Sequence, residues 1–186
     1  DRNVINKTAR LLGMMGLNNT VHYDSEDEIN FMMDTCFFER INNKKSATEK
    51  YLESNKPIND FEKEVFEMFL NSYISAFIVT EVEREKNKIH LSDLFSDKKI
   101  DIIDIGLSKT AVSGLVIFFR YLKYKEIGLT SGVSYVYNFS DVEEVNREYG
   151  KLTKIIKEKD ENIKKILIFK RLNNKYGLGM EFEDVE

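Results

Sequence analysis

Apolar residues recur at helical spacing in two parts of the chain, before residue 74 and after residue 140. The stretch from Asp60 is the clearest, because Phe61, Val65, Phe69 and Tyr73 form one broad stripe that must pack on something. The spacing predicts helices at about residues 3–15, 26–42, 47–54, 60–73, 141–159 and 162–174.

Polar residues mark several of these helix starts. A serine or asparagine three residues before a glutamate can accept one free amide, while the glutamate reaches back to another. Four such pairs are present: Ser25 with Glu28, Ser46 with Glu49, Asn59 with Glu62, and Ser140 with Glu143. These pairs support the predicted starts of four helices.

Between residues 75 and 139 the period changes to two. Apolar, β-branched and aromatic residues alternate with polar ones, and Asn87, Ser96–Asp97 and Gly128 mark turns. Leu115–Leu122 is apolar on both faces, which is typical of a central strand. No helix separates the strands, so a βαβ arrangement is excluded.

The predicted fold class is therefore α+β. N-terminal helices (1–74) precede a central antiparallel sheet of five or six strands (75–139), either open or curled into a small, partly open barrel. A C-terminal helical pair (140–186) completes what we expect to be one integrated domain.

Composition agrees with a globular protein, since 42% of residues are hydrophobic and 32% are charged. The net charge is −4, but its distribution is uneven. Residues 1–108 carry 14 basic and 20 acidic groups, residues 109–176 carry 14 and 8, and the last ten carry none and four. A basic block thus lies between two acidic ones.

Cysteine usage and hydropathy indicate the compartment. The single cysteine, Cys36, excludes an internal disulfide and favours a reducing, cytoplasmic location. It belongs to a helical face that we expect to be buried: Ile29, Met32, Met33, Cys36, Phe37 and Ile41. No apolar run approaches the roughly 20 residues of a membrane span, and the first residues are not typical of a signal peptide. Because the sequence begins with Asp1, we expect a fragment or a processed chain.

Four short segments of the middle region carry a family resemblance: Ile89–Leu94, Gly106–Ser108, Gly114–Arg120 and Thr130–Gly132. Their order resembles the β-rich module of uncharacterised bacterial proteins that often carry a SEC-C zinc motif. The resemblance implies a fold for the sheet. It does not carry over a zinc-linked or secretion-linked role, because the cysteine and histidine cluster of the SEC-C tail is absent here.

The sequence predicts no catalytic centre, no metal site and no cofactor. Gly106–Thr110 and Gly128–Gly132 lack the Gly-Lys-Ser/Thr ending of a phosphate-binding loop, so both are interpreted as strand-connecting turns. His90 and Asp93 should point to opposite faces of a strand. One alternative stays open, a hydrolase that uses a pair from the dense carboxylates Asp93, Asp97, Asp101 and Asp104.

Arg120 is the most unusual residue, since it interrupts the apolar strand Leu115–Leu122. It either pairs with an acid such as Asp93 or Asp101, or it binds an anionic ligand on the sheet face. Arg120 and Asp93 are therefore the candidate ligand-binding residues.

The basic C-terminal helices are the second candidate site. Their lysines lie opposite apolar positions: Lys151, Lys154, Lys157, Lys164 and Lys165. Such stripes bind phosphate backbones, and the tyrosines of a small barrel can stack on bases: Tyr121, Tyr124, Tyr135 and Tyr137. Lysine outnumbers arginine 21 to 7, however, and arginine reads phosphates better.

The leading hypothesis is a non-catalytic interaction module of a bacterial-type cytoplasmic protein. Its partner is another protein or a second copy of the chain, because the apolar stripes exceed what one copy covers. Nucleic-acid binding and hydrolysis are the alternatives, and no membrane partner is expected.

Overall fold

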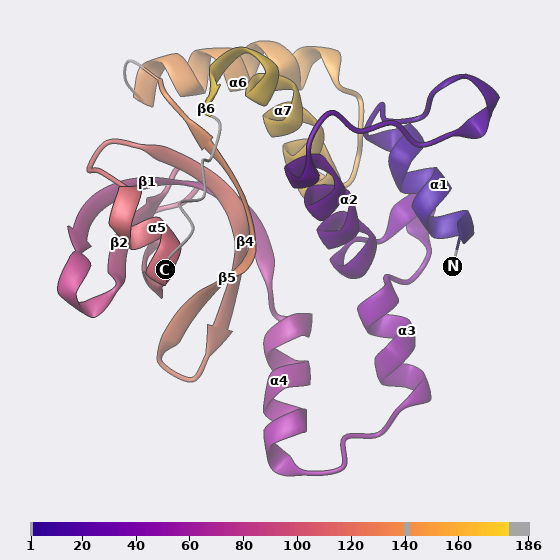
Figure 1. Cartoon of the computed structure of the whole chain (residues 1–186), viewed down its shortest axis with the longest axis horizontal. Coiled ribbons are helices and arrows are strands. Elements are labelled where there is room, and N and C mark those ends of the chain that lie inside the picture. Colours follow the sequence, from indigo (N-terminus) through magenta and orange to yellow (C-terminus); the bar gives the residue numbers. More distant parts are fainter. Residues whose placement is uncertain (1, 140–141, 179–186) are drawn as a thin grey trace. The chain divides into compact units, whose positions relative to one another are not determined.

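The computed structural model describes residues 2–139 and 142–178, and Figure 1 labels most of its helices and strands. The helices are α1 (Arg2–Leu11), α2 (Glu26–Phe38), α3 (Ala47–Ser54), α4 (Asp60–Leu70), α5 (Ile105–Thr110), α6 (Val142–Ile155) and α7 (Glu161–Tyr176). The strands are β1 (Tyr73–Glu83), β2 (Lys88–Asp93), β3 (Lys99–Ile103), β4 (Val116–Tyr124), β5 (Ile127–Tyr137) and β6 (Gly177–Leu178). The predicted α+β class is confirmed, with N-terminal helices and a C-terminal helical pair.

Side-chain caps set the helix starts as predicted. Ser46 accepts from the Glu49 amide at 3.2 Å, and Glu49 accepts from the Ser46 amide at 2.9 Å, which completes a reciprocal capping box on α3. Ser25 and Asn59 likewise cap α2 and α4. The fourth predicted pair includes Ser140, which lies outside the described residues.

Five predictions about helices need correction. Helix α1 ends at Leu11, four residues before the predicted end, and α4 ends at Leu70, three residues before it. Residues 105–110 form α5 and not a strand-connecting turn, because the Asp104 carboxylate accepts from the Leu107 amide at 2.8 Å and starts a helix. Helix α6 ends at Ile155, four residues before the predicted end. Helix α2 ends at Phe38, and its predicted buried face is narrower, since Met33 and Phe37 are 41% and 49% exposed. These two residues share a row 100° away from the buried Met32–Cys36 row.

The strands form one open antiparallel sheet in the order β3-β2-β1-β4-β5-β6. The turn between β1 and β2 uses Asn87 in the left-handed conformation, with φ of 52°, as expected for asparagine. Strand β4 lies between β1 and β5, and Val116–Leu122 are all buried. The apolar residues on both faces of β4 are therefore explained by its central position in the sheet, as predicted.

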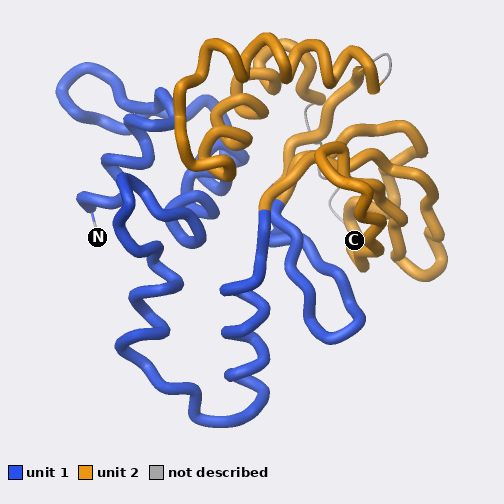
Figure 2. The backbone as a smooth tube through the Cα atoms, turned by 180° about the vertical axis from the view of Figure 1, so that it is seen from behind, with its two compact units in different colours: residues 1–73, 120–133 blue, residues 74–119, 134–186 orange. Residues whose placement is uncertain are grey.

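The chain divides into two compact units, drawn in different colours in Figure 2. Unit 1 comprises residues 1–73 and 120–133, and unit 2 comprises residues 74–119 and 134–186. Unit 1 thus combines the N-terminal helices with the end of β4 and the start of β5. Neither unit is a continuous stretch of the chain.

Unit 2 has a core of aromatic rings centred on Phe169 of α7. The Phe169 ring stacks on Phe118 with centroids 4.4 Å apart, and its backbone oxygen accepts from the Tyr137 hydroxyl at 2.8 Å. Phe95 and Tyr149 also contact this ring, at 6.0 Å and 5.9 Å. Helix α7 is thereby fixed against β4 and β5 within the unit.

Candidate functional site

Arg120 is buried in unit 1 between two carboxylates. Its Nε lies 3.1 Å from Asp34 Oδ2, and its Nη2 lies 2.6 Å from Glu39 Oε1. The guanidinium also lies over the Phe38 ring, 4.4 Å from the centroid. Arg120 is only 2% exposed, so the cluster is closed to solvent.

The prediction that Arg120 pairs with an acid is confirmed, but the partners are Asp34 and Glu39 in place of Asp93 or Asp101. Asp34 lies within α2, whereas Glu39 follows its last residue with extended backbone, at ψ of 148°. Ending α2 there turns the Glu39 carboxylate to Arg120. The sequence signal was an acid in the mostly apolar second half of α2, but sequence spacing could not join this segment to a strand 81 residues later.

Asp93, the other candidate ligand residue, is buried on the inner face of β2 in unit 2. Its Oδ1 accepts from the Ser75 hydroxyl at 3.1 Å and from the Phe95 amide at 2.8 Å. Strand β2 alternates as predicted, since His90 and Asp93 lie on opposite faces. The Asp93 carboxylate thus stabilises the turn after β2.

The remaining carboxylates of this region have separate structural partners. Asp104 caps α5, and Asp101 contacts Lys88 at 2.7 Å and His90 at 2.7 Å. Asp97 is exposed in the turn after β2. Each carboxylate therefore has its own environment, and no two of them face each other across a described pocket.

His90 bridges two carboxylates at the solvent-facing side of unit 2. Its Nε2 lies 2.9 Å from Glu83 Oε1, and its Nδ1 lies 2.7 Å from Asp101 Oδ1. The hydrogen bond with Glu83, followed by the bond and charge of Asp101, raises the pKa of His90 above its usual 6.5. Only the protonated ring can donate to both carboxylates at once.

This bridge gives a pH-dependent contribution to stability. A raised folded-state pKa means that the contribution is complete below pH 6.5 and is lost as the pH rises through the folded-state pKa. The free energy of unfolding of His90→Gln should therefore fall less between about pH 6 and about pH 8 than that of the parent chain. Urea titrations at both pH values measure this difference, and equal pH dependence of the two proteins would contradict it.

The predicted lysine stripe on the C-terminal helices divides into different environments. Lys151 pairs with Glu148 at 2.6 Å, and Lys164 pairs with Glu161 at 3.9 Å. Lys165 lies over the Phe95 ring at 4.8 Å, and burial lowers its pKa. Lys154 and Lys157 are exposed, but Lys157 follows the end of α6.

The tyrosines proposed for base stacking are mostly buried. Tyr121, Tyr135 and Tyr137 are 9%, 5% and 0% exposed. Tyr124 donates its hydroxyl to Glu64 at 2.9 Å. Their rings therefore serve the packing of the sheet.

Helix α4 packs only part of the apolar stripe that the sequence predicts to be packed. Phe69 contacts Phe38 with ring centroids 5.7 Å apart, whereas Phe61 and Leu70 are 64% and 55% exposed. Six of its eleven residues are apolar, yet none of the eleven is buried. Tyr51 of α3 contacts Phe66 with ring centroids 5.8 Å apart, and Leu70 follows Phe66 by one turn. Tyr51 and Leu70 are 53% and 55% exposed, and we call Tyr51, Phe66 and Leu70 the α3–α4 surface.

Acidic groups outnumber basic ones on the two helices that carry this surface. Helices α3 and α4 contain six acidic residues and two lysines. Figure 1 shows the two helices joined by the loop of residues 55–59. Glu49, Glu53 and Glu64 pair with Arg40, Lys45 and Lys125, so the excess negative charge lies on α4, beside Phe66 and Leu70. An apolar patch with charged residues at its edge is typical of an interaction site.

Residues 2–139 and 142–178 contain no metal-binding cluster and no helix that could span a membrane. No group of three or more histidine, cysteine or acidic side chains there could hold a metal ion. No helix in these ranges has both the length and the apolar character needed to cross a membrane.

Comparison with known proteins gives one finding. No curated protein and no solved structure matches the chain. A family of unknown function, DUF7986, matches residues 1–183. Since this match spans nearly the whole sequence, the chain belongs to the DUF7986 family.

Proposed function

We propose that this chain is a non-catalytic interaction module that binds another protein through the α3–α4 surface. The observation that carries the proposal is α4 itself, which has six apolar residues and no buried one. Apolar side chains left at a helix surface favour association, because a partner removes them from water.

The surrounding charge supports a different protein as the partner, in place of a second copy. Asp60 and Glu67 of α4 are exposed, and two copies meeting face to face would bring like charges together. A partner that places an apolar anchor between lysines or arginines would complement this surface. The proposed module therefore recognises an apolar protein segment with a basic rim.

Two other hypotheses have less support. The proposed nucleic-acid site would use the five lysines of the C-terminal helices, of which two pair with glutamates and one covers a ring. The proposed hydrolase would need two facing carboxylates, whereas Asp93, Asp101 and Asp104 have separate partners. Both stay alternatives to protein binding.

The proposed location is a reducing cytoplasm of bacterial type. Support comes from Cys36, which is a free, buried cysteine, and whose pKa is raised by burial. The sheet resemblance to SEC-C-associated proteins is proposed to extend to fold only, and β4 contains its Val116–Arg120 strand.

Photo-cross-linking tests the proposed surface. A photoreactive phenylalanine analogue at position 70 should link one defined protein in the source cells, and the same analogue at position 112 should not. Val112 is a suitable control, because it is 52% exposed and belongs to unit 2, whereas Leu70 is 55% exposed.

The linked protein is then purified and its affinity for the chain is measured by calorimetry. Leu70→Ser should weaken binding at least about tenfold, the effect of removing an interface anchor, and Val112→Ser should leave it unchanged. Equal affinities for both variants would overturn the proposal. If light scattering shows that the parent chain is a dimer and that Leu70→Ser is a monomer, the partner is a second copy of the chain and not a different protein.

A further inference from the structure

A pocket in unit 1 gathers lysines from three elements. It is lined by α1, the segment after α2 and α3, through Asn3, Val4, Lys7, Glu39, Ile41, Lys44, Lys45 and Lys50. It contains about 420 Å³ of empty space, open solvent at its mouth included. Without that open solvent the pocket measures about 80 Å³, below the about 300–1,000 Å³ of sites that enclose a whole small molecule, so it can hold one small group of a ligand.

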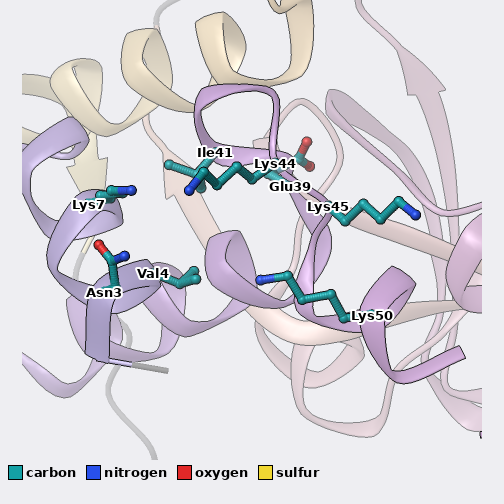
Figure 3. A pocket seen from close by; sticks show the side chains of 8 residues that line it. All are labelled: Asn3, Val4, Lys7, Glu39, Ile41, Lys44, Lys45 and Lys50. Carbon is teal, nitrogen blue, oxygen red and sulfur yellow. The ribbon is translucent and has the colours of Figure 1, made fainter. Parts of the chain in front are cut away.

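The ammonium groups of three lysines point into this pocket. Figure 3 shows the ammonium ends of Lys7, Lys44 and Lys50 projecting toward the region around Val4 and Ile41. Lys45 points away from it, and its ammonium group pairs with Glu53. The left-handed Asn42 and Asn43, with φ of 54° and 59°, turn the chain so that Lys44 follows at the pocket.

The carboxylates near the pocket form ion pairs with cations other than these three lysines. Glu39 is the one acid that lines the pocket, and it pairs with Arg120 at 2.6 Å. Glu49 accepts from Arg40 Nε at 2.9 Å, and this bond lowers the pKa of Glu49 to about 2. Within the described chain, Lys7, Lys44 and Lys50 therefore have no carboxylate within 4.0 Å.

We propose that this lysine pocket binds a phosphate group carried by a small molecule. Three ammonium groups offer nine hydrogen-bond donors to an oxyanion, and lysine binds phosphate as a point charge. Like charges held near one another repel, so a multivalent anion gains more here than a monovalent one. Val4 and the buried Ile41 provide an apolar wall for the uncharged part of the ligand.

A soluble phosphate and a lipid head group offer the same chemistry, so two probes separate them. Pyrophosphate in solution is titrated into the full chain by calorimetry, at about 50 mM salt to limit screening. Phosphatidylcholine vesicles with and without phosphatidic acid are tested by co-sedimentation. Binding of pyrophosphate alone identifies a soluble ligand, and binding of the vesicles with phosphatidic acid identifies a lipid.

Matched lysine variants show whether the pocket is responsible. Lys44→Gln should weaken probe binding roughly tenfold, the value of one charged hydrogen bond. Lys56→Gln makes the same charge change at an exposed lysine outside the pocket and should change affinity less than about twofold. Thermal melting checks that both variants fold.

Two results would overturn the proposal. One is the absence of binding by either probe below about 10 mM. The other is equal weakening by Lys44→Gln and Lys56→Gln, which would indicate diffuse attraction to the surface. Neither result depends on a protein partner, so the pocket and the α3–α4 surface are tested separately.

Discussion

Replacing Arg120 by alanine is expected to lower the free energy of unfolding by about 3–5 kcal/mol. The substitution leaves Asp34 and Glu39 buried without their cation, at 8% and 5% exposure. It also removes the guanidinium from the Phe38 ring. Urea denaturation followed by circular dichroism measures the change.

Arg147→Ala is the matched control for this result. Arg147 also faces two glutamates, at 3.6 Å and 3.7 Å, but its side chain is 57% exposed. An exposed pair contributes about 0–1 kcal/mol, so this variant should be nearly as stable as the parent chain. If Arg120→Ala cost no more than Arg147→Ala, the buried cluster would not hold α2 to β4.

A second test separates unpaired charge from lost packing. The triple variant Asp34→Leu, Glu39→Met and Arg120→Met removes all three charges together. Hydrophobic replacement of a buried ion cluster is often neutral or stabilising, so this variant should exceed Arg120→Ala in stability. A triple variant as unstable as Arg120→Ala would instead assign the loss to packing.

Phe169→Ala should cost about 3–5 kcal/mol of unfolding free energy, the range for a buried phenylalanine. Its ring contacts Phe118, Phe95 and Tyr149, and truncation leaves a cavity among them. Phe37→Ala is the control, since the Phe37 side chain is 49% exposed and should lose far less. Equal losses in the two urea titrations would contradict this prediction. They would indicate that the surrounding rings move to fill the space left by Phe169.

The local parts of the fold were predictable because their causes lie within a few residues. Ser46 and Glu49 form the reciprocal cap that their spacing predicts. Strand β4 is buried on both faces, as its apolar run with Arg120 as the exception indicates. Helix α5 was missed because its six residues contain too little periodicity, although Asp104 is a recognisable cap.

The candidate sites were less predictable because they depend on contacts between distant segments. Arg120 was identified as unusual, but its partners Asp34 and Glu39 lie in α2 and directly after it, more than 80 residues earlier. The lysine pocket joins Lys7 to Lys44 and Lys50 through the packing of α1 and the segment after α2. Composition likewise could not indicate that Phe61 and Leu70 of α4 stay 64% and 55% exposed.

The divided sequence of unit 1 has a consequence for synthesis on the ribosome. A nascent chain that ends at Tyr73 contains both acids of the buried cluster but lacks Arg120, which is translated 86 residues after Asp34. Closing so long a loop is slow, and premature burial of two uncompensated carboxylates is unfavourable. We therefore expect the carboxylates of Asp34 and Glu39 to become buried only after Arg120 has been translated.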